Sequence, residues 1–265
     1  MRIWHQGFID LSTVPAYEPA LRRHLAAVCR PDTEVVIHGM PPGSFEGTSP
    51  AQVARHAYLS GLYTNEIVSN AIVAEREGFD AMAIAIIQHI GLHESRSLVD
   101  LPVTNYGEAA IHLACQFGRR FAIVAFNRDL FDLLEENVRD YGLSGRMTPM
   151  QLMEIDYDQV ARGFDDPQPL LRAFERAASA AIAAGADVLI PGQMIFAEIL
   201  WQNGLHRVGD TPVMDALGAC VKTAEILVDL KRSSGLSQAR RGFWGARPPA
   251  AVVEAARRRY LRQGG

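Results

Sequence analysis

The turn after the apolar run at residues 81–87 holds the titratable side chain that is best placed for chemistry, His89. The run suits a buried strand, and Gln88-His89-Ile90 follows it directly. Histidine exchanges a proton near neutral pH, so His89 could act as a general acid or base. The alternative is a surface histidine beside the start of a helix.

A metal site is a second reading of the same turn. His93 stands four residues after His89, and Glu94 follows it. Positions i and i+4 share one face of a helix, which suits a metal ion. However, Gly91 interrupts the helix there and no acidic third ligand is evident. We therefore expect no metal and no other cofactor.

Polar residues also end or follow two other strand-like segments. His5 and Gln6 end the first segment of the chain, and Asn127 and Arg128 follow the run at residues 121–126. The Asn127 amide could donate hydrogen bonds to a carboxylate or an oxyanion, and Arg128 could supply positive charge. The alternatives are an ordinary polar strand end and a surface arginine.

Tyr106 and Glu108 follow the short segment that ends at Val103. Tyr106 could contact a substrate. Glu108 could be a second acid or base, but acidic residues also favour the first turn of a helix, and we favour that structural role.

Three cysteines (Cys29, Cys115 and Cys220) lie far apart without a CxxC spacing. Each falls within a helical pattern, where cysteine is commonly a small buried apolar residue. This usage argues against a disulfide framework and fits a reducing cytoplasm. The N-terminus has no signal-peptide layout and no apolar run approaches the roughly 18 residues of a membrane span, so we expect a cytoplasmic protein.

Strand and helix patterns alternate along the chain. Continuous apolar runs suit strands that are covered on both faces, as in a parallel sheet, and they occur at residues 81–87, 121–126 and 188–190. Helical patterns follow each of them, at residues 91–99, 129–141 and 196–203, and another runs from 51 to 77 after Ser49-Pro50. Alternation of this kind predicts an α/β fold with doubly wound sheets.

An internal repeat indicates two similar lobes. The blocks that begin at Gly78-Phe79-Asp80 and Gly185-Ala186-Asp187 each contain a strand, a polar turn and a helix, and each ends in Asp-x-Pro-Val. Ligands of open α/β sheets bind beyond the carboxyl ends of the strands. Two facing lobes would therefore place the site in the cleft between them.

The C-terminal segment differs from the rest in charge. Residues 231–265 carry nine Lys or Arg and one acid, against 17 basic and 29 acidic residues in the remainder. A basic tail could bind nucleic acid, but we favour packing against the acidic body or a neighbouring subunit. We expect an extended arm at 242–245, a basic helix at 250–262, and a homo-oligomer formed through this arm, with no nucleic-acid or membrane partner.

Several segments together resemble the hydantoin/allantoin racemase branch of the aspartate/glutamate racemase superfamily. The resemblance spans roughly residues 1–230. Its segments are residues 4–6, 74–81, 91–103, 107–110, 118–124, 141–143 and 212–215 with the following helix.

The resemblance implies two flavodoxin-like lobes with pseudo-twofold symmetry and an active site in the interlobe cleft. Lobe one would hold residues 1–103 and 213–230, lobe two residues 104–212, and residues 231–265 would form the arm. Family members use two cysteines, one from each lobe, to move a proton at the carbon beside a carbonyl, without a cofactor. His5 and Gln6 would contact the substrate carboxylate.

The two family cysteine positions fall at Ile86 and Gln193, and neither residue is a proton-transfer base. Gln193 could instead hold an oxyanion, and Ile86 would present an apolar wall to the substrate. We therefore expect a cofactor-independent enzyme that acts on a small carbonyl or carboxylate compound, hydantoin-like or amino-acid-like, by isomerase-type proton transfer with non-cysteine groups. A lyase or decarboxylase, a hydrolase using His89, and a non-catalytic binding protein are the alternatives.

Overall fold

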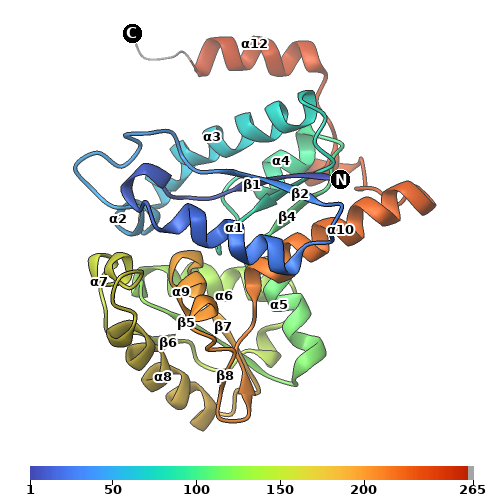
Figure 1. The fold of residues 1–265 in the computed structure, drawn as a ribbon. Helices are drawn as coiled ribbons and strands as arrows, with labels where there is room; N and C mark the ends of the chain where they lie inside the picture. Colours follow the sequence, from blue (N-terminus) through green and yellow to red (C-terminus); the bar gives the residue numbers. More distant parts are fainter. Residues whose placement is uncertain (262–265) are drawn as a thin grey trace.

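A computed structural model describes residues 1–261 and contains two parallel sheets. The first sheet has the order β2-β1-β3-β4 and occupies the upper half of Figure 1. Its strands are β1 (Arg2–Gln6), β2 (Glu34–His38), β3 (Ala81–Ile84) and β4 (Val103–Asn105). Thr104 and Asn105, expected in the second lobe, pair with Ala83 and Ile84 in this sheet.

The second sheet repeats the arrangement of the first in a smaller form. Its order is β6-β5-β7, and all its pairs are parallel. A short antiparallel hairpin joins β8 to β9. The strands are β5 (Phe121–Ala125), β6 (Gln151–Leu152), β7 (Val188–Pro191), β8 (Arg207–Val208) and β9 (Thr211–Pro212). The predicted α/β fold with two lobes is confirmed.

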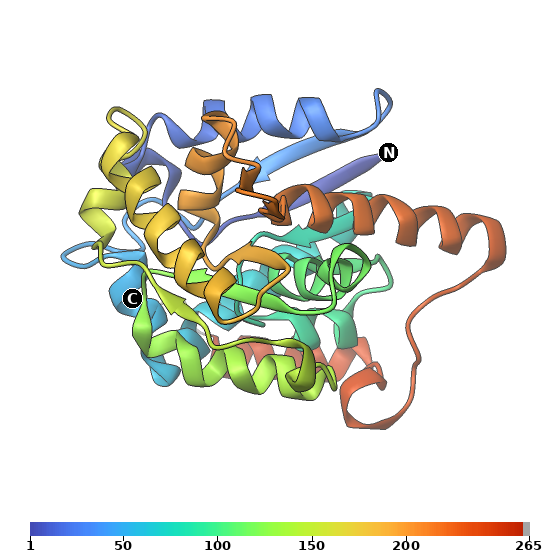
Figure 2. The same cartoon turned by 90° about the horizontal axis from the view of Figure 1, so that it is seen from below.

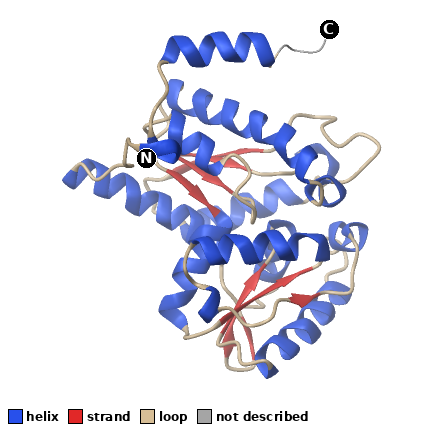
Figure 3. Cartoon of the chain, turned by 180° about the vertical axis from the view of Figure 1, so that it is seen from behind, coloured by secondary structure: helices blue, strands red, loops and turns tan. Residues whose placement is uncertain are grey.

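Helices cover both faces of the sheets, as Figure 3 shows. Parallel strands are joined by crossovers, which place helices on the sheet faces and bury the strands. The helices are α1 (Tyr17–Val28), α2 (Pro50–Ala54), α3 (Ala57–Arg76), α4 (Leu92–Leu98), α5 (Tyr106–Phe117), α6 (Phe131–Asp140), α7 (Tyr157–Arg162), α8 (Gln168–Ala183), α9 (Met194–Gln202), α10 (Ala216–Ser234), α11 (Gly242–Gly245) and α12 (Ala250–Tyr260).

Two helix predictions need correction. The helical stretch expected over residues 51–77 is two helices, because α2 ends at Ala54 and α3 begins at Ala57. Apolar spacing continues on both sides of this short break, so periodicity did not reveal it. Residues 242–245, expected as an extended arm, form one helical turn. The Ser49 side chain caps α2 with Pro50 at its first turn, as expected.

The long helix α10 joins the two halves of the molecule. It packs against α5, β3 and β4, and Figure 2 shows it leading toward the C-terminal arm. At its start the Asp215 side chain accepts a hydrogen bond from the Gly218 N–H at 2.7 Å, the helix cap that the sequence suggested. A helix fixed at its first turn and packed on both halves limits their relative motion.

The C-terminal arm lies on its own acidic body. Arg240 pairs with Asp100 at 2.7 Å, and Arg247 pairs with Glu75 at 3.0 Å. Helix α12 lies over α3 in Figure 1, where Arg257 donates to the Ser69 hydroxyl at 2.8 Å. The described part of α12 buries no side chain, and residue 262 of the expected basic helix lies outside the described residues.

Within residues 1–261 no helix has the length and apolar character that crossing a membrane requires.

A tight contact between α5 and the turn after β3 gives a stability prediction. A Cβ added at Gly107 would lie 2.3 Å from the Ile87 carbonyl oxygen, which is backbone and cannot simply rotate away. We expect Gly107→Ala to lower the free energy of unfolding by about 1–3 kcal/mol, the usual cost of overpacking.

Gly61→Ala is the matched control. Gly61 lies in α3, and a Cβ there would meet nothing within 4 Å. Alanine should therefore raise the stability by up to about 1 kcal/mol through helix propensity. Urea unfolding of both variants measures the difference, and equal effects of the two substitutions would refute the steric argument.

Candidate active site

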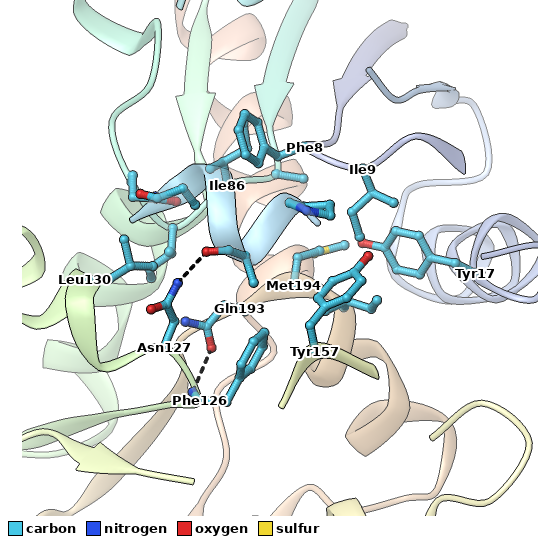
Figure 4. Close-up of a pocket in the computed structure, with 17 residues that line it drawn as sticks. Phe8, Ile9, Tyr17, Ile86, Phe126, Asn127, Leu130, Tyr157, Gln193 and Met194 are labelled. Carbon is cyan, nitrogen blue, oxygen red and sulfur yellow. Dashed lines mark hydrogen bonds between the residues drawn. The ribbon is translucent and has the colours of Figure 1, made fainter. Parts of the chain in front are cut away.

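A cavity lies between the two lobes. Its wall is mostly apolar and comes from the ends of β3, β5 and β7 and from the starts of α1, α2, α7 and α9 (Figure 4). Mostly apolar cavities with a few polar groups commonly hold small molecules. The lining residues are Phe8, Ile9, Tyr17, Pro50, Ala51, Ala54, Ala85, Ile86, Ile87, Gln88, Phe126, Asn127, Leu130, Tyr157, Gln193, Met194 and Ile195.

The buried amide of Asn105 shapes the turn after β3. Its Nδ2 donates to the carbonyl oxygens of Ile86 at 2.7 Å and Gln88 at 2.9 Å. Its Oδ1 accepts from the Glu108 N–H at 3.0 Å and so caps α5. One side chain therefore fixes both the cavity wall at Ile86 and the start of α5. Asn105 was not among the predicted site residues, although an Asn at a strand end before a helix is a recognisable cap signal.

Two amide side chains in the wall each have one hydrogen-bonding atom without a partner among the described residues. Gln193 Oε1 accepts from the Phe126 N–H at 3.2 Å, and its buried Nε2 has no partner among the described residues. Asn127 Nδ2 donates to the Ala51 carbonyl at 2.9 Å, and its buried Oδ1 likewise has no partner there. The bonded atoms fix which end of each amide is nitrogen. Two residues that line the cavity therefore hold one unpaired donor, Gln193 Nε2, and one unpaired acceptor, Asn127 Oδ1, within the described part of the chain.

The first turn of α9 adds backbone donors. Gln193 is the residue before the helix and makes no side-chain cap, while Met194 and Ile195 line the cavity. First-turn N–H groups have no partner within a helix and carry partial positive charge. They can stabilise negative charge that develops on an oxygen in the cavity.

The titratable groups of the cavity wall are two phenols, Tyr17 and Tyr157. Burial and the nearby charge of Glu198 hold the pKa of Tyr17 well above its ordinary value. Burial and Asp158 raise the pKa of Tyr157 to about 12, and its buried hydroxyl has no hydrogen-bond partner within residues 1–261. Figure 4 shows both hydroxyls on one side of the cavity, with Gln193 and Asn127 on the other. Nothing local in the sequence marks these two tyrosines.

The family model described as Asp/Glu/Hydantoin racemase matches residues 7–224. This chain belongs to that family. The hydantoin racemase of Pseudomonas sp. (strain NS671) is 29% identical over 234 residues, which is 86% of this chain and 88% of the relative. The hydantoin racemase of Paenarthrobacter aurescens is 28% identical over 199 residues, covering 74% and 82%.

Solved structures share the fold. Allantoin racemase from Klebsiella pneumoniae superposes with a TM-score of 0.76 at 22% identity and covers 94% of each chain. Arylmalonate decarboxylase superposes with a TM-score of 0.54 at 18% identity, covering 92% of this chain and 97% of the other. The two-lobed architecture is thus that of the racemase family.

None of the three cysteines of this family member lines the cavity. Burial and the charge of Glu225 raise the pKa of Cys29 to about 11. Burial raises the pKa of Cys220 to about 12, and its sulfur contacts the Thr104 hydroxyl. Cys115 lies in α5, where its sulfur contacts the Ile111 carbonyl. The wall of the cavity in this racemase-family chain therefore contains no thiol.

Of the predicted site residues, Ile86, Asn127 and Gln193 line the cavity, whereas His5 and Gln6 do not. His5 is fully buried, and burial together with His38 lowers its pKa to about 4. The Gln6 amide donates to the carbonyls of Gly7 and Gly39. Both side chains point into the interior of lobe one rather than toward a ligand in this cavity.

His89 also lies outside the cavity wall. Its Nε2 contacts the Tyr141 hydroxyl, and its ring packs edge-on against His93 at 5.3 Å. Burial, and then the charge of His93, lower the pKa of His89 to about 4, so its imidazole is neutral at pH 7. Among residues 1–261 there is no cluster of three or more His, Cys, Asp or Glu that could hold a metal ion.

The other three predicted residues make structural contacts. Glu108 forms an ion pair with Arg96, and although burial favours its neutral form, this partner lowers its pKa overall. The Tyr106 hydroxyl donates to the Pro191 carbonyl at 2.8 Å and so ties α5 to β7. The Arg128 guanidinium lies over the Phe131 ring at 4.8 Å.

Proposed function

We propose that this racemase-family chain is a cofactor-independent enzyme that moves a proton at the carbon next to the carbonyl of a small amide-containing compound, such as a hydantoin-like ring. The compound would bind in the interlobe cavity. Its reaction would be of the isomerase type and would pass through an enolate-like intermediate.

The unused donor of Gln193 and the unused acceptor of Asn127 carry this proposal. A buried polar atom without a partner costs about 1–3 kcal/mol, so a ligand that satisfies both atoms gains affinity. An amide offers a C=O to Gln193 Nε2 and an N–H to Asn127 Oδ1. The names of the relatives, hydantoin racemase and allantoin racemase, agree with such a ligand.

The rest of the wall fits an uncharged, substituted amide. No Lys, Arg, Asp or Glu lines the described cavity, so a carboxylate or an ammonium group on the ligand would be buried without an oppositely charged partner. Ile86, Phe8 and Leu130 instead provide an apolar surface for a hydrocarbon substituent.

The phenols would supply the acid and base. One of Tyr17 and Tyr157, when ionised, would remove the proton. Gln193 Nε2 and the first-turn N–H groups of α9 would hold the resulting oxyanion, and a phenol would return a proton. Because Figure 4 places both hydroxyls on one side of the cavity, the planar intermediate would turn over in the cavity before a phenol returns a proton to its opposite face.

The pH dependence follows from the raised pKa of the phenols. With the pKa of Tyr157 at about 12, the ionised fraction grows with pH throughout the neutral range. We expect kcat to rise about tenfold per pH unit between about pH 6 and 8.5. Initial rates measured in buffers of constant ionic strength check this, and a bell centred on neutral pH would contradict a phenolate base.

Decarboxylation of a substituted acid is the second candidate, and one observation favours it. Burial keeps both phenols protonated at neutral pH, and a decarboxylase needs only a donor that protonates the enolate-like product. In this case kcat would be flat over the same pH range, and CO₂ would be released.

A matched pair of ligands tests the proposed site. Calorimetry would compare a ring amide that carries an apolar substituent with its N-methyl derivative. Methylation removes the donor for Asn127 Oδ1, so we expect the affinity to fall about tenfold or more. Equal affinity of the two ligands, or binding of neither, would refute the amide assignment.

The oligomer expected through the C-terminal arm is a further proposal. Phe243 and Trp244 of the arm are 87% and 64% exposed, and exposed aromatic pairs commonly mark protein contacts. We expect truncation after Leu230 to lower the molar mass measured by light scattering to that of a smaller assembly. A Phe243→Ser, Trp244→Ser variant of the full chain is the milder control, and no change in either would argue against the arm as an interface.

A further inference from the structure

Three charged side chains meet in the interior behind the cavity. His24 on α1 lies with its Nδ1 2.8 Å from Glu198 Oε2 on α9, and with its Nε2 3.1 Å from Asp215 Oδ2 at the start of α10. The side chains of His24 and Glu198 are 3% and 0% exposed. The imidazole stacks on the Trp201 ring with centroids 3.9 Å apart. None of the three charged groups lines the cavity.

The contact joins the two helices that carry the proposed chemistry. Tyr17 precedes His24 by two turns on α1, so the phenol and the imidazole lie on the same face of that helix. Gln193 immediately precedes α9, and Glu198 lies about one turn into it. The His24–Glu198 bond therefore sets how the start of α1 lies against the start of α9.

We propose that His24 is a positioning residue that holds the Tyr17 hydroxyl in register with the Gln193 amide by clamping α1 to α9 and to the start of α10. This inference rests on the proposed function of the cavity. Its physical basis is that each ring nitrogen is hydrogen-bonded to a carboxylate, which holds the imidazole in one orientation.

The clamp requires the imidazolium form, because only that form has two N–H donors. The groups that face His24 are Glu198 from α9, Asp215 from the start of α10, and His206, which lines the same small cavity before β8. Burial alone would lower the pKa of His24, but the hydrogen bonds to Asp215 and Glu198 outweigh it and raise the pKa to about 9. At neutral pH the clamp is charged.

Two carboxylate-to-amide variants give the decisive comparison. Glu198→Gln removes the charge that holds α9, whereas Glu225→Gln removes an equally buried carboxylate that instead pairs with Arg30 and Lys222. Misplacement of a reacting group by about 1 Å can cost about 10²-fold in rate. We expect Glu198→Gln to lower kcat by tenfold or more with KM within about threefold, and Glu225→Gln to change kcat by less than about threefold. Equal losses in both variants would overturn the proposal.

A fluorescence titration tests the clamp without any substrate. Protonated imidazole quenches a stacked indole, so the part of the emission that Trp201→Phe removes should change with a midpoint near pH 9. In Asp215→Asn the midpoint should fall by about 1–3 pH units, because one carboxylate partner is lost. A native midpoint near the ordinary histidine pKa, or one that Asp215→Asn leaves in place, would overturn the proposal.

Hydrogen–deuterium exchange separates the failure of the clamp from the failure of the proposed function. If the native chain turns over no amide substrate, the proposed function fails, and the rate comparison falls with it. The hydrogen-bonded amides of α9 should still exchange faster in Glu198→Gln than in the native chain, with no such change in Glu225→Gln. Unchanged exchange at α9 would overturn the clamp regardless of activity.

Discussion

Tyr157→Phe should lower kcat by about 10²–10⁴-fold, the usual contribution of a positioned general acid or base. The substitution removes only the hydroxyl, which is buried in the cavity wall without a hydrogen-bond partner in the described part of the chain. The ring remains to pack, so the affinity for an amide ligand should stay within about threefold. Steady-state kinetics and calorimetry on the same preparation measure the two quantities.

The same substitution should not destabilise the protein. Replacing an unsatisfied buried hydroxyl by hydrogen removes a desolvation cost, so the free energy of unfolding should be unchanged or higher. Tyr58→Phe, at a tyrosine that is 77% exposed on α3, is the control and should change neither activity nor stability. If Tyr157→Phe retains native kcat, the phenol is not the proton-transfer group.

His24→Ala should lower the free energy of unfolding by about 3–5 kcal/mol, because it leaves the fully buried Glu198 carboxylate without its partner. The control breaks an exposed pair. Asp229 and Arg30 have side chains that are 45% and 36% exposed, and Asp229→Ala should lower the stability far less than His24→Ala. Urea unfolding at pH 7 compares the two variants. Similar losses of unfolding free energy would show that the buried contact contributes no more stability than the exposed pair.

The stability of the native chain should also depend on pH through His24. Its folded pKa of about 9 lies above the ordinary histidine value of 6.5, so the folded state binds the proton more tightly. The resulting stabilisation is fully present below pH 6.5 and is lost as the pH rises through 9. It amounts to roughly 3 kcal/mol, because each tenfold gain in proton affinity on folding contributes about 1.4 kcal/mol. The loss should be absent from His24→Ala, and urea unfolding between pH 6 and pH 10 measures it.

The sequence predicted the fold because the fold depends on local patterns. Continuous apolar runs mark β3, β5 and β7, and the repeated Gly-x-Asp and Asp-x-Pro-Val blocks mark equivalent positions of the two lobes. The resemblance to the racemase family singled out Ile86 and Gln193, and the strand pattern singled out Asn127; all three line the cavity, each two residues after a parallel strand.

The rest of the site depends on contacts that no local pattern records. His89 follows Gln88 in the same turn, yet it packs against Tyr141 and His93 and does not line the cavity. Tyr17 and Tyr157 reach the cavity from the first turns of two distant helices. The contact of His24 with Glu198 and Asp215 joins residues separated by more than 170 positions, and only the packed structure brings them together.

Deuterium exchange followed by NMR tests the central claim most directly. The native chain and Tyr157→Phe would each be incubated in D₂O with separate enantiomers of ring amides that carry an apolar substituent at the carbon next to a carbonyl. We expect deuterium to enter at that carbon as each enantiomer converts into the other, and Tyr157→Phe to lose both the exchange and the interconversion. Exchange that survives in Tyr157→Phe, exchange without interconversion of the enantiomers, or tight binding without any exchange would contradict a phenol-driven isomerisation in this cavity.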